Sequence, residues 1–175
     1  MADYTLTDKE SALLGQEFLT WLWFRSEMDN GLFATPDGHN FTVFMDQRVQ
    51  VQGGEGDEKE TAVVTGAHAR MAEAKMGLRR GKKVGKAQLK FDQDGEEWTV
   101  QVKAEDFALG SMKPPKVEKT SDDDPDAVFL EKLFLIENCL TFLDTLYTRF
   151  LDLRLSPNKW EEEVSSFRHW LAKEE

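Results

Sequence analysis

Six of the seven residues from Phe18 to Phe24 (FLTWLWF) are large and apolar, and only Thr20 interrupts them. The spacing of these residues is helical, and a capping box at Thr7–Glu10 predicts a helix start, with Asn30-Gly31 as its stop. A surface helix normally has one apolar stripe, whereas this helix is apolar on nearly every side. We therefore expect the rest of the chain to bury it almost completely.

Three aromatic residues of this helix, Trp21, Trp23 and Phe24, are candidates for the core or for an interface with a partner. Stacking of their rings on nucleic-acid bases is the alternative. The helical spacing and the neighbouring leucines favour burial. If the helix is exposed in the monomer, we expect a partner, such as a second copy, to cover it.

The next part of the chain predicts antiparallel strands. Alternating apolar residues over 41–51, with a turn at Asp46-Gln47, indicate one hairpin, and 62–64 indicate a short strand. A second alternating stretch over 87–102 surrounds Asp94-Gly95, which is a typical two-residue hairpin turn.

Helices are expected between and after these hairpins. Residues 66–80 favour a helix that ends at Gly81, and 112–116 favour an extended connector. Two further helices are expected, over 127–153 and from about 157. In the longer helix, residues spaced by three and four predict a packing seam of Leu133, Ile136, Leu140, Leu143, Tyr147 and Phe150.

The predicted fold class is α+β, a mostly antiparallel sheet of four to five strands packed by N-terminal, central and two C-terminal helices. We expect one domain over 1–175, with a helix–hairpin–helix–hairpin core at 7–117 and a helical pair at 125–175. The start of the chain lacks the basic and apolar regions of a signal peptide, and no uncharged apolar run is long enough for a membrane span. We therefore expect a cytoplasmic protein without a membrane partner.

The charge of the chain is segregated along the sequence. The net charge is −11, but residues 70–90 hold eight basic residues and one acid, Glu73, so this segment carries +7 and the remainder −18. Cations on one face bind phosphates without sequence preference, although they also offset the acidic remainder and aid solubility. The candidate DNA-binding residues are Arg70, Lys75, Arg79, Arg80, Lys82, Lys83, Lys86 and Lys90.

Candidates for catalysis and metal binding are weak. The three histidines, His39, His68 and His169, lie far apart and have no partner at metal-ligand spacing. The single cysteine, Cys139, falls within an apolar helix and excludes an internal disulfide and a cysteine-based zinc site. We expect no enzyme activity, no cofactor and no metal.

Two segments resemble RdgC-type recombination-associated proteins, the first resembling a motif of shorter members and the second a run in the C-terminal half of longer members. One is Leu14–Ser26 (LGQEFLTWLWFRS), and the other is Gly81–Leu89 (GKKVGKAQL), with the expected elements in the same order over 11–117. The resemblance implies a nucleoid-associated protein that binds single- or double-stranded DNA without sequence preference, and in that family the protein dimerises into a ring. It also implies a possible recombination protein as partner, and Lys82, Lys83 and Lys86 as DNA-facing residues.

The acidic remainder of the chain supports a second hypothesis. A surface with this charge can engage a basic protein, so an acidic protein-interaction module is the alternative to a DNA-binding protein. The N-terminal part of the longer RdgC-type members has no counterpart here, so ring formation does not follow from the resemblance.

Overall fold

A computed structural model describes residues 13–53, 60–65, 68–120, 122 and 124–173. These residues form four helices, α1 Gly15–Met28, α2 His68–Arg79, α3 Pro125–Arg154 and α4 Pro157–Ala172. They also form six strands, β1 Leu32–Ala34, β2 Asn40–Gly53, β3 Glu60–Thr65, β4 Lys83–Gln93, β5 Glu96–Lys103 and β6 Leu109–Lys113. The capping box expected at Thr7–Glu10 lies outside the described residues.

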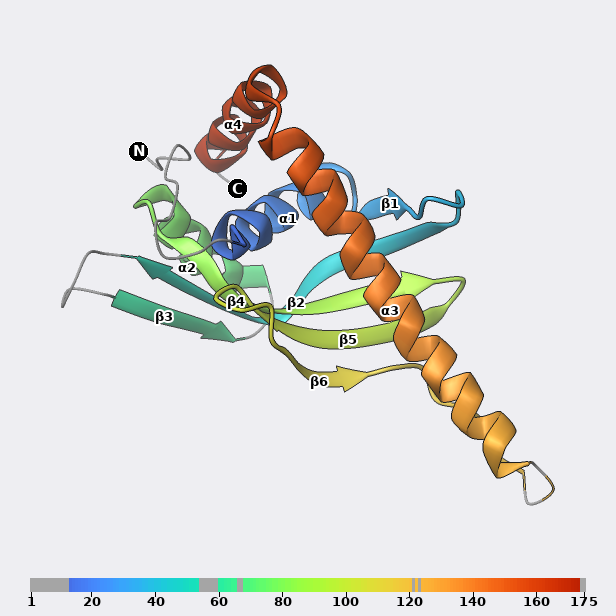
Figure 1. The fold of residues 1–175 in the computed structure, drawn as a ribbon. Helices are drawn as coiled ribbons and strands as arrows, with labels where there is room; N and C mark the ends of the chain where they lie inside the picture. Colours follow the sequence, from blue (N-terminus) through green and yellow to red (C-terminus); the bar gives the residue numbers. More distant parts are fainter. Residues whose placement is uncertain (1–12, 54–59, 66–67, 121, 123, 174–175) are drawn as a thin grey trace.

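The six strands form a single antiparallel sheet in the order β1-β2-β4-β5-β6, and β3 pairs with the second half of β2. Figure 1 shows the four helices on one side of this sheet, and none of the described helices covers the other side. The predicted α+β class is therefore confirmed, with one strand more than the upper expectation. We call the uncovered side the helix-free face.

The first predicted hairpin is wrong, because residues 40–53 form one long strand. Asp46-Gln47 lies where the pairing of β2 with β4 shifts register, between Met45 and Val49. Such a bulge bends a strand without reversing it. The second hairpin is confirmed, since β4 and β5 pair around Asp94-Gly95. The expected connector at 112–116 begins with the end of β6, a strand that its weak apolar alternation did not reveal.

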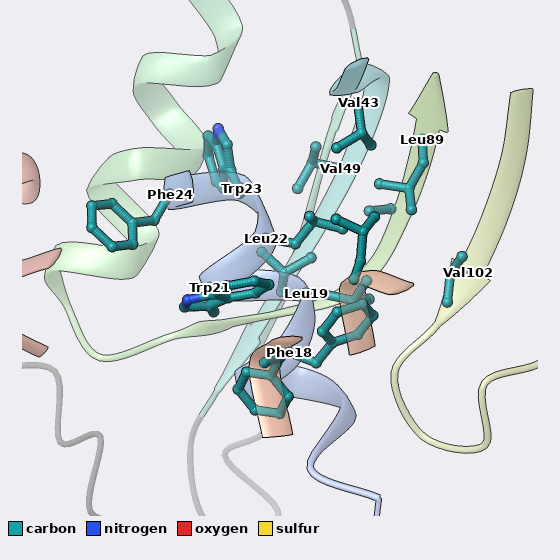
Figure 2. Close-up of a cluster of buried hydrophobic side chains, with 14 of the residues drawn as sticks. Phe18, Leu19, Trp21, Leu22, Trp23, Phe24, Val43, Val49, Leu89 and Val102 are labelled. Carbon is teal, nitrogen blue, oxygen red and sulfur yellow. The ribbon is translucent and has the colours of Figure 1, made fainter. Parts of the chain in front are cut away.

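Helix α1 occupies the centre of the core. Figure 2 shows its apolar side chains against Val43, Val49, Leu89 and Val102 of the sheet, and each of these residues is at most 1% exposed. The helix starts very close to the loop after β5, since a Cβ on Gly15 would lie 1.8 Å from the carbonyl oxygen of Ala104. Only glycine allows this approach, which seats α1 directly on the sheet.

The apolar stripe of α3 that faces the core differs from the predicted seam. The predicted seam is wrong in the first half of the helix, where Leu133 and Leu140 are exposed, and right in the second half, where Phe150 is buried and Leu143 and Tyr147 pack on the core. The buried residues of α3 are Leu135, Cys139, Phe142, Leu146 and Phe150. The first half of this helix is apolar around much of its circumference, so spacing alone did not define which side packs. The helix expected from about 157 is confirmed, because α4 begins at Pro157. Over the described residues, no helix combines the length and apolarity needed to cross a bilayer.

Candidate nucleic-acid interface

Two of the eight predicted DNA-binding cations point toward the helices, where α1 supplies carboxylates. The ammonium of Lys75 lies 3.1 Å from Glu27 Oε2 and 4.6 Å from the centre of the Trp170 ring. The ammonium of Lys83 lies 3.8 Å from Glu17 Oε1, and both lysine side chains are only 12% exposed. Lys75 joins α2 to α1 and α4, and Lys83 joins β4 to α1, so these two cations offer little surface to a phosphate.

Two more predicted cations are engaged at the surface. Arg79 donates from Nε to the carbonyl of Leu171 at 2.6 Å and from Nη2 to that of Lys173 at 3.0 Å, where α4 ends. A cation is favourable at such a helix C-terminus. The ammonium of Lys90 lies 2.9 Å from Glu97 Oε1, and this hydrogen bond raises the pKa of Lys90.

The remaining four cations differ in accessibility. The side chain of Arg70 is outside the described part of the chain. Arg80 is exposed in the turn after α2, and Lys82 is half-buried with contacts of its own. Lys86 is half-exposed in the middle of β4. The structure thus does not bring the eight cations together on one surface.

The helix-free face contains a different group of cations, centred on Lys86. In the register of the sheet, Gln50 of β2, Lys86 of β4 and Lys103 of β5 lie side by side. Neither lysine forms an ion pair with a carboxylate of the described residues. Lysines directly opposite each other on adjacent strands repel, so this pair concentrates positive charge at a cost in stability.

Other residues of the helix-free face extend this group. The alternation of each strand and the pairing of Thr99 with Lys113 place five cations on this face, against three carboxylates, for a local charge of +2. The cations are Arg48, Lys86, Lys90, Lys103 and Lys113, and the carboxylates are Asp46, Asp92 and Glu97. Between the lysines lie Gln88 and Gln101, and Gln88 Nε2 donates to Asp46 Oδ2 at 2.9 Å.

The sequence contained a signal for Lys103 that we missed. A two-residue turn at Asp94-Gly95 sets Gln93 opposite Glu96, and counting back along both strands sets Lys86 opposite Lys103. The basic segment 70–90 ends before the partner strand β5, so a charge count over this segment does not include Lys103. Cross-strand register, rather than a window along the sequence, identifies this pair.

The aromatic residues of α1 form no outer surface. Trp21, Trp23 and Phe24 are each 1% exposed, so the interface we considered there is not accessible in the folded chain. Trp23 Nε1 donates to Glu27 at 2.9 Å, and Phe24 packs on Phe167. Helix α4, rather than a partner protein, covers this side of α1.

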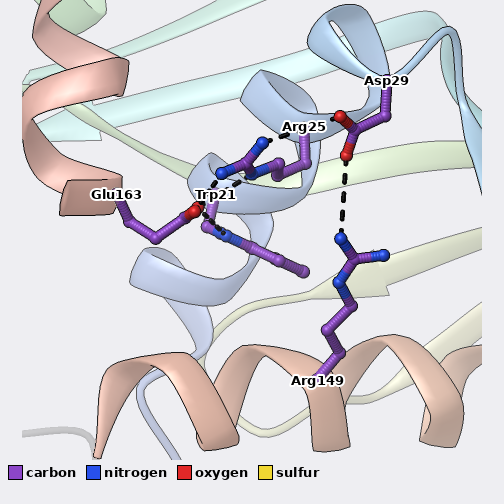
Figure 3. A network of polar contacts seen from close by, with 5 residues as sticks. All are labelled: Trp21, Arg25, Asp29, Arg149 and Glu163. Atoms are coloured by element: carbon purple, nitrogen blue, oxygen red, sulfur yellow. Dashed lines mark hydrogen bonds and ion pairs between the residues drawn. The ribbon is translucent and has the colours of Figure 1, made fainter. Parts of the chain in front are cut away.

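A polar network links α1 to both C-terminal helices. Figure 3 shows Glu163 of α4 accepting hydrogen bonds from Trp21 Nε1 at 2.9 Å and from Arg25 Nε at 2.8 Å. Arg25 Nη1 also lies 3.6 Å from Asp29, which lies 3.9 Å from Arg149 of α3. Each charge in this half-buried group has an opposite charge beside it, so the network explains the position of the helices.

No described segment gathers three or more histidine, cysteine, aspartate or glutamate side chains as a metal site would require. Burial raises the pKa of the Cys139 thiol to about 11, so this group is a poor nucleophile at neutral pH.

A scan of protein-family models, a search of curated proteins and a search of solved structures each found no match to this chain.

Proposed function

We propose that this chain is a non-catalytic protein that binds DNA without sequence preference, through the helix-free face of its sheet. The observation that carries the proposal is the pair of lysines, Lys86 and Lys103, that lie opposite each other without carboxylate partners. A polyanion bound over this face would relieve their repulsion. Lys86 is central to this surface and was expected from the sequence. Lys103 was not among the residues expected from the sequence.

The chemistry of the helix-free face suits a phosphate backbone. The lysines are flanked by Gln50, Gln88 and Gln101, whose amides can donate hydrogen bonds to phosphate or sugar oxygens. Contacts of this kind position a nucleic acid but do not read its bases. Phe44 is 44% exposed on the same face and offers one ring on which an unpaired base can stack.

The acidic body of the protein predicts moderate affinity and strong salt dependence. Four of the face's cations, Arg48, Lys86, Lys103 and Lys113, make no ion pair with the described residues. If each cation contacts one phosphate of a duplex, a plot of the logarithm of the DNA association constant against the logarithm of the salt concentration should have a slope of roughly −3 to −4. The association with recombination or replication is supported by the resemblance to RdgC-type proteins alone.

Fluorescence anisotropy with a labelled duplex and a labelled single strand tests the proposal at several salt concentrations. We expect the double variant Lys86→Glu/Lys103→Glu to weaken binding at least tenfold at low salt and to reduce the salt slope by about 2. The matched control is Lys159→Glu/Arg168→Glu, which makes the same charge change at exposed positions of α4.

Equal loss of binding in both variants would mean that only net charge matters, and would refute the assignment to the helix-free face. Absence of binding at low salt would refute the DNA proposal itself. That result would favour the alternative, an acidic module that binds a basic protein.

A further inference from the structure

The first half of α3 carries large apolar side chains on the side that points away from the core. Four of them are between 42% and 63% exposed within two helical turns, and a fifth, six residues further along, is 45% exposed. In order along the helix they are Phe129, Leu130, Leu133, Phe134 and Leu140. We call these five residues the α3 apolar face.

The position of this face follows from the length of α3. At about 1.5 Å per residue, a 30-residue helix is about 45 Å long. Figure 1 shows its N-terminal part extending beyond the sheet, with no other helix or strand of the described chain on its outer side. Leu135, Cys139 and Phe142 face the core, and the residues of the α3 apolar face lie around the remaining circumference.

The exposed area is large enough to matter. Taking roughly 200 Å² for a whole phenylalanine and slightly less for leucine, the five side chains expose on the order of 500 Å² of apolar surface. This is near the upper end of apolar patches on monomeric proteins. Two such faces packed together would bury about 1,000 Å², which is the lower bound for a specific interface.

We propose that the α3 apolar face is a homodimer interface, in which α3 packs antiparallel against α3 of a second copy. The face is self-complementary under a two-fold rotation. With the axis between Glu131 and Lys132, Phe129 of one copy lies level with Phe134 of the other, and Leu130 lies level with Leu133. An isologous contact needs this match of a surface with itself.

Charge predicts how this dimer responds to salt. This part of the helix carries four acids, Asp124, Asp126, Glu131 and Glu137, against one base, Lys132, and each whole chain carries −11. Two copies therefore repel, and added salt should strengthen the dimer by screening this repulsion. DNA binding by the helix-free face should weaken with salt, so the two proposals succeed or fail independently.

Sedimentation equilibrium of the full chain, over a range of protein concentrations and at two salt concentrations, tests the dimer. We expect the mass to rise from 20.1 kDa toward twice that value, at lower protein concentration when salt is higher. Leu130→Glu/Phe134→Glu should weaken the dimer at least a hundredfold. Both side chains are about 60% exposed, so this variant should keep the circular dichroism and unfolding of a folded chain.

The matched control is Leu32→Glu/Leu155→Glu, which introduces the same charges at exposed leucines outside the α3 apolar face and should leave the dimer intact. A wild-type chain that stays at 20.1 kDa at every concentration would overturn the proposal and leave this face to a different protein. A dimer that Leu130→Glu/Phe134→Glu does not weaken would overturn it as well.

Discussion

Two phenylalanines of α3 test which side of this helix packs on the sheet. Phe142 is 2% exposed, and its ring lies 4.6 Å from that of Phe41, 5.2 Å from Trp98 and 5.4 Å from Phe91. Phe134, eight residues earlier on the same helix, is 60% exposed. The same substitution at the two positions therefore differs in burial but hardly in helix propensity.

We expect Phe142→Ala to lower the free energy of unfolding by about 4 kcal/mol, the usual range for a buried phenylalanine being about 3–5 kcal/mol. With a urea m-value of about 2 kcal/mol/M for a domain of this size, the midpoint should fall by about 2 M. Phe134→Ala should change the free energy by no more than about 0.5 kcal/mol and the midpoint by about 0.3 M.

The assay is urea unfolding followed by far-ultraviolet circular dichroism and by tryptophan fluorescence. It should be performed at low protein concentration, because Phe134 also belongs to the proposed dimer interface and a dimer would add its own stabilisation. Equal losses in the two variants would show that the core-facing stripe of α3 is assigned incorrectly. A large loss for Phe134→Ala alone would show that the side of α3 opposite Phe142 packs on the sheet.

Two further predictions concern the core. Gly15→Ala should unfold at lower urea concentration by at least 1 M, because its Cβ would overlap the Ala104 carbonyl; an unchanged midpoint would contradict this close approach. Cys139 should resist alkylation by iodoacetamide at pH 8 in the folded chain, because burial raises the pKa of its thiol to about 11, and should react after unfolding in urea. Mass spectrometry of the reacted protein measures the difference, and rapid labelling of the folded chain would refute the buried position.

Local signals in the sequence were sufficient for much of the fold. Asp94-Gly95 has the chemistry of a tight turn, and the structure has the hairpin there, with Asp94 and Gly95 at positive φ. Asp46-Gln47 has no such requirement, and its polar side chains suit a bulge as well as they suit a turn. The sequence did not distinguish the two, because the bulge is defined by pairing with β4, forty residues away.

The candidate site was less predictable, for a related reason. The sequence shows that Lys75 and Lys83 belong to a basic segment, but their partners Glu27 and Glu17 are on α1, about 50 and 66 residues away along the chain. Only the tertiary packing of α1 beside α2 and on the sheet brings these charges together. A one-dimensional count therefore overestimates the positive surface wherever the cations face the interior.

The sidedness of the sheet explains how one basic segment has two roles. On the covered side, Lys83 compensates Glu17, a carboxylate that is 2% exposed and also accepts a hydrogen bond from Arg154 at 2.6 Å. A buried carboxylate without such partners would be strongly destabilising, so these cations are needed for the fold. On the uncovered side, Lys86 and Lys103 compensate nothing within the described residues and instead repel each other. Positive charge that the fold does not require, on a chain that is acidic overall, is the charge most directly available to an anionic ligand.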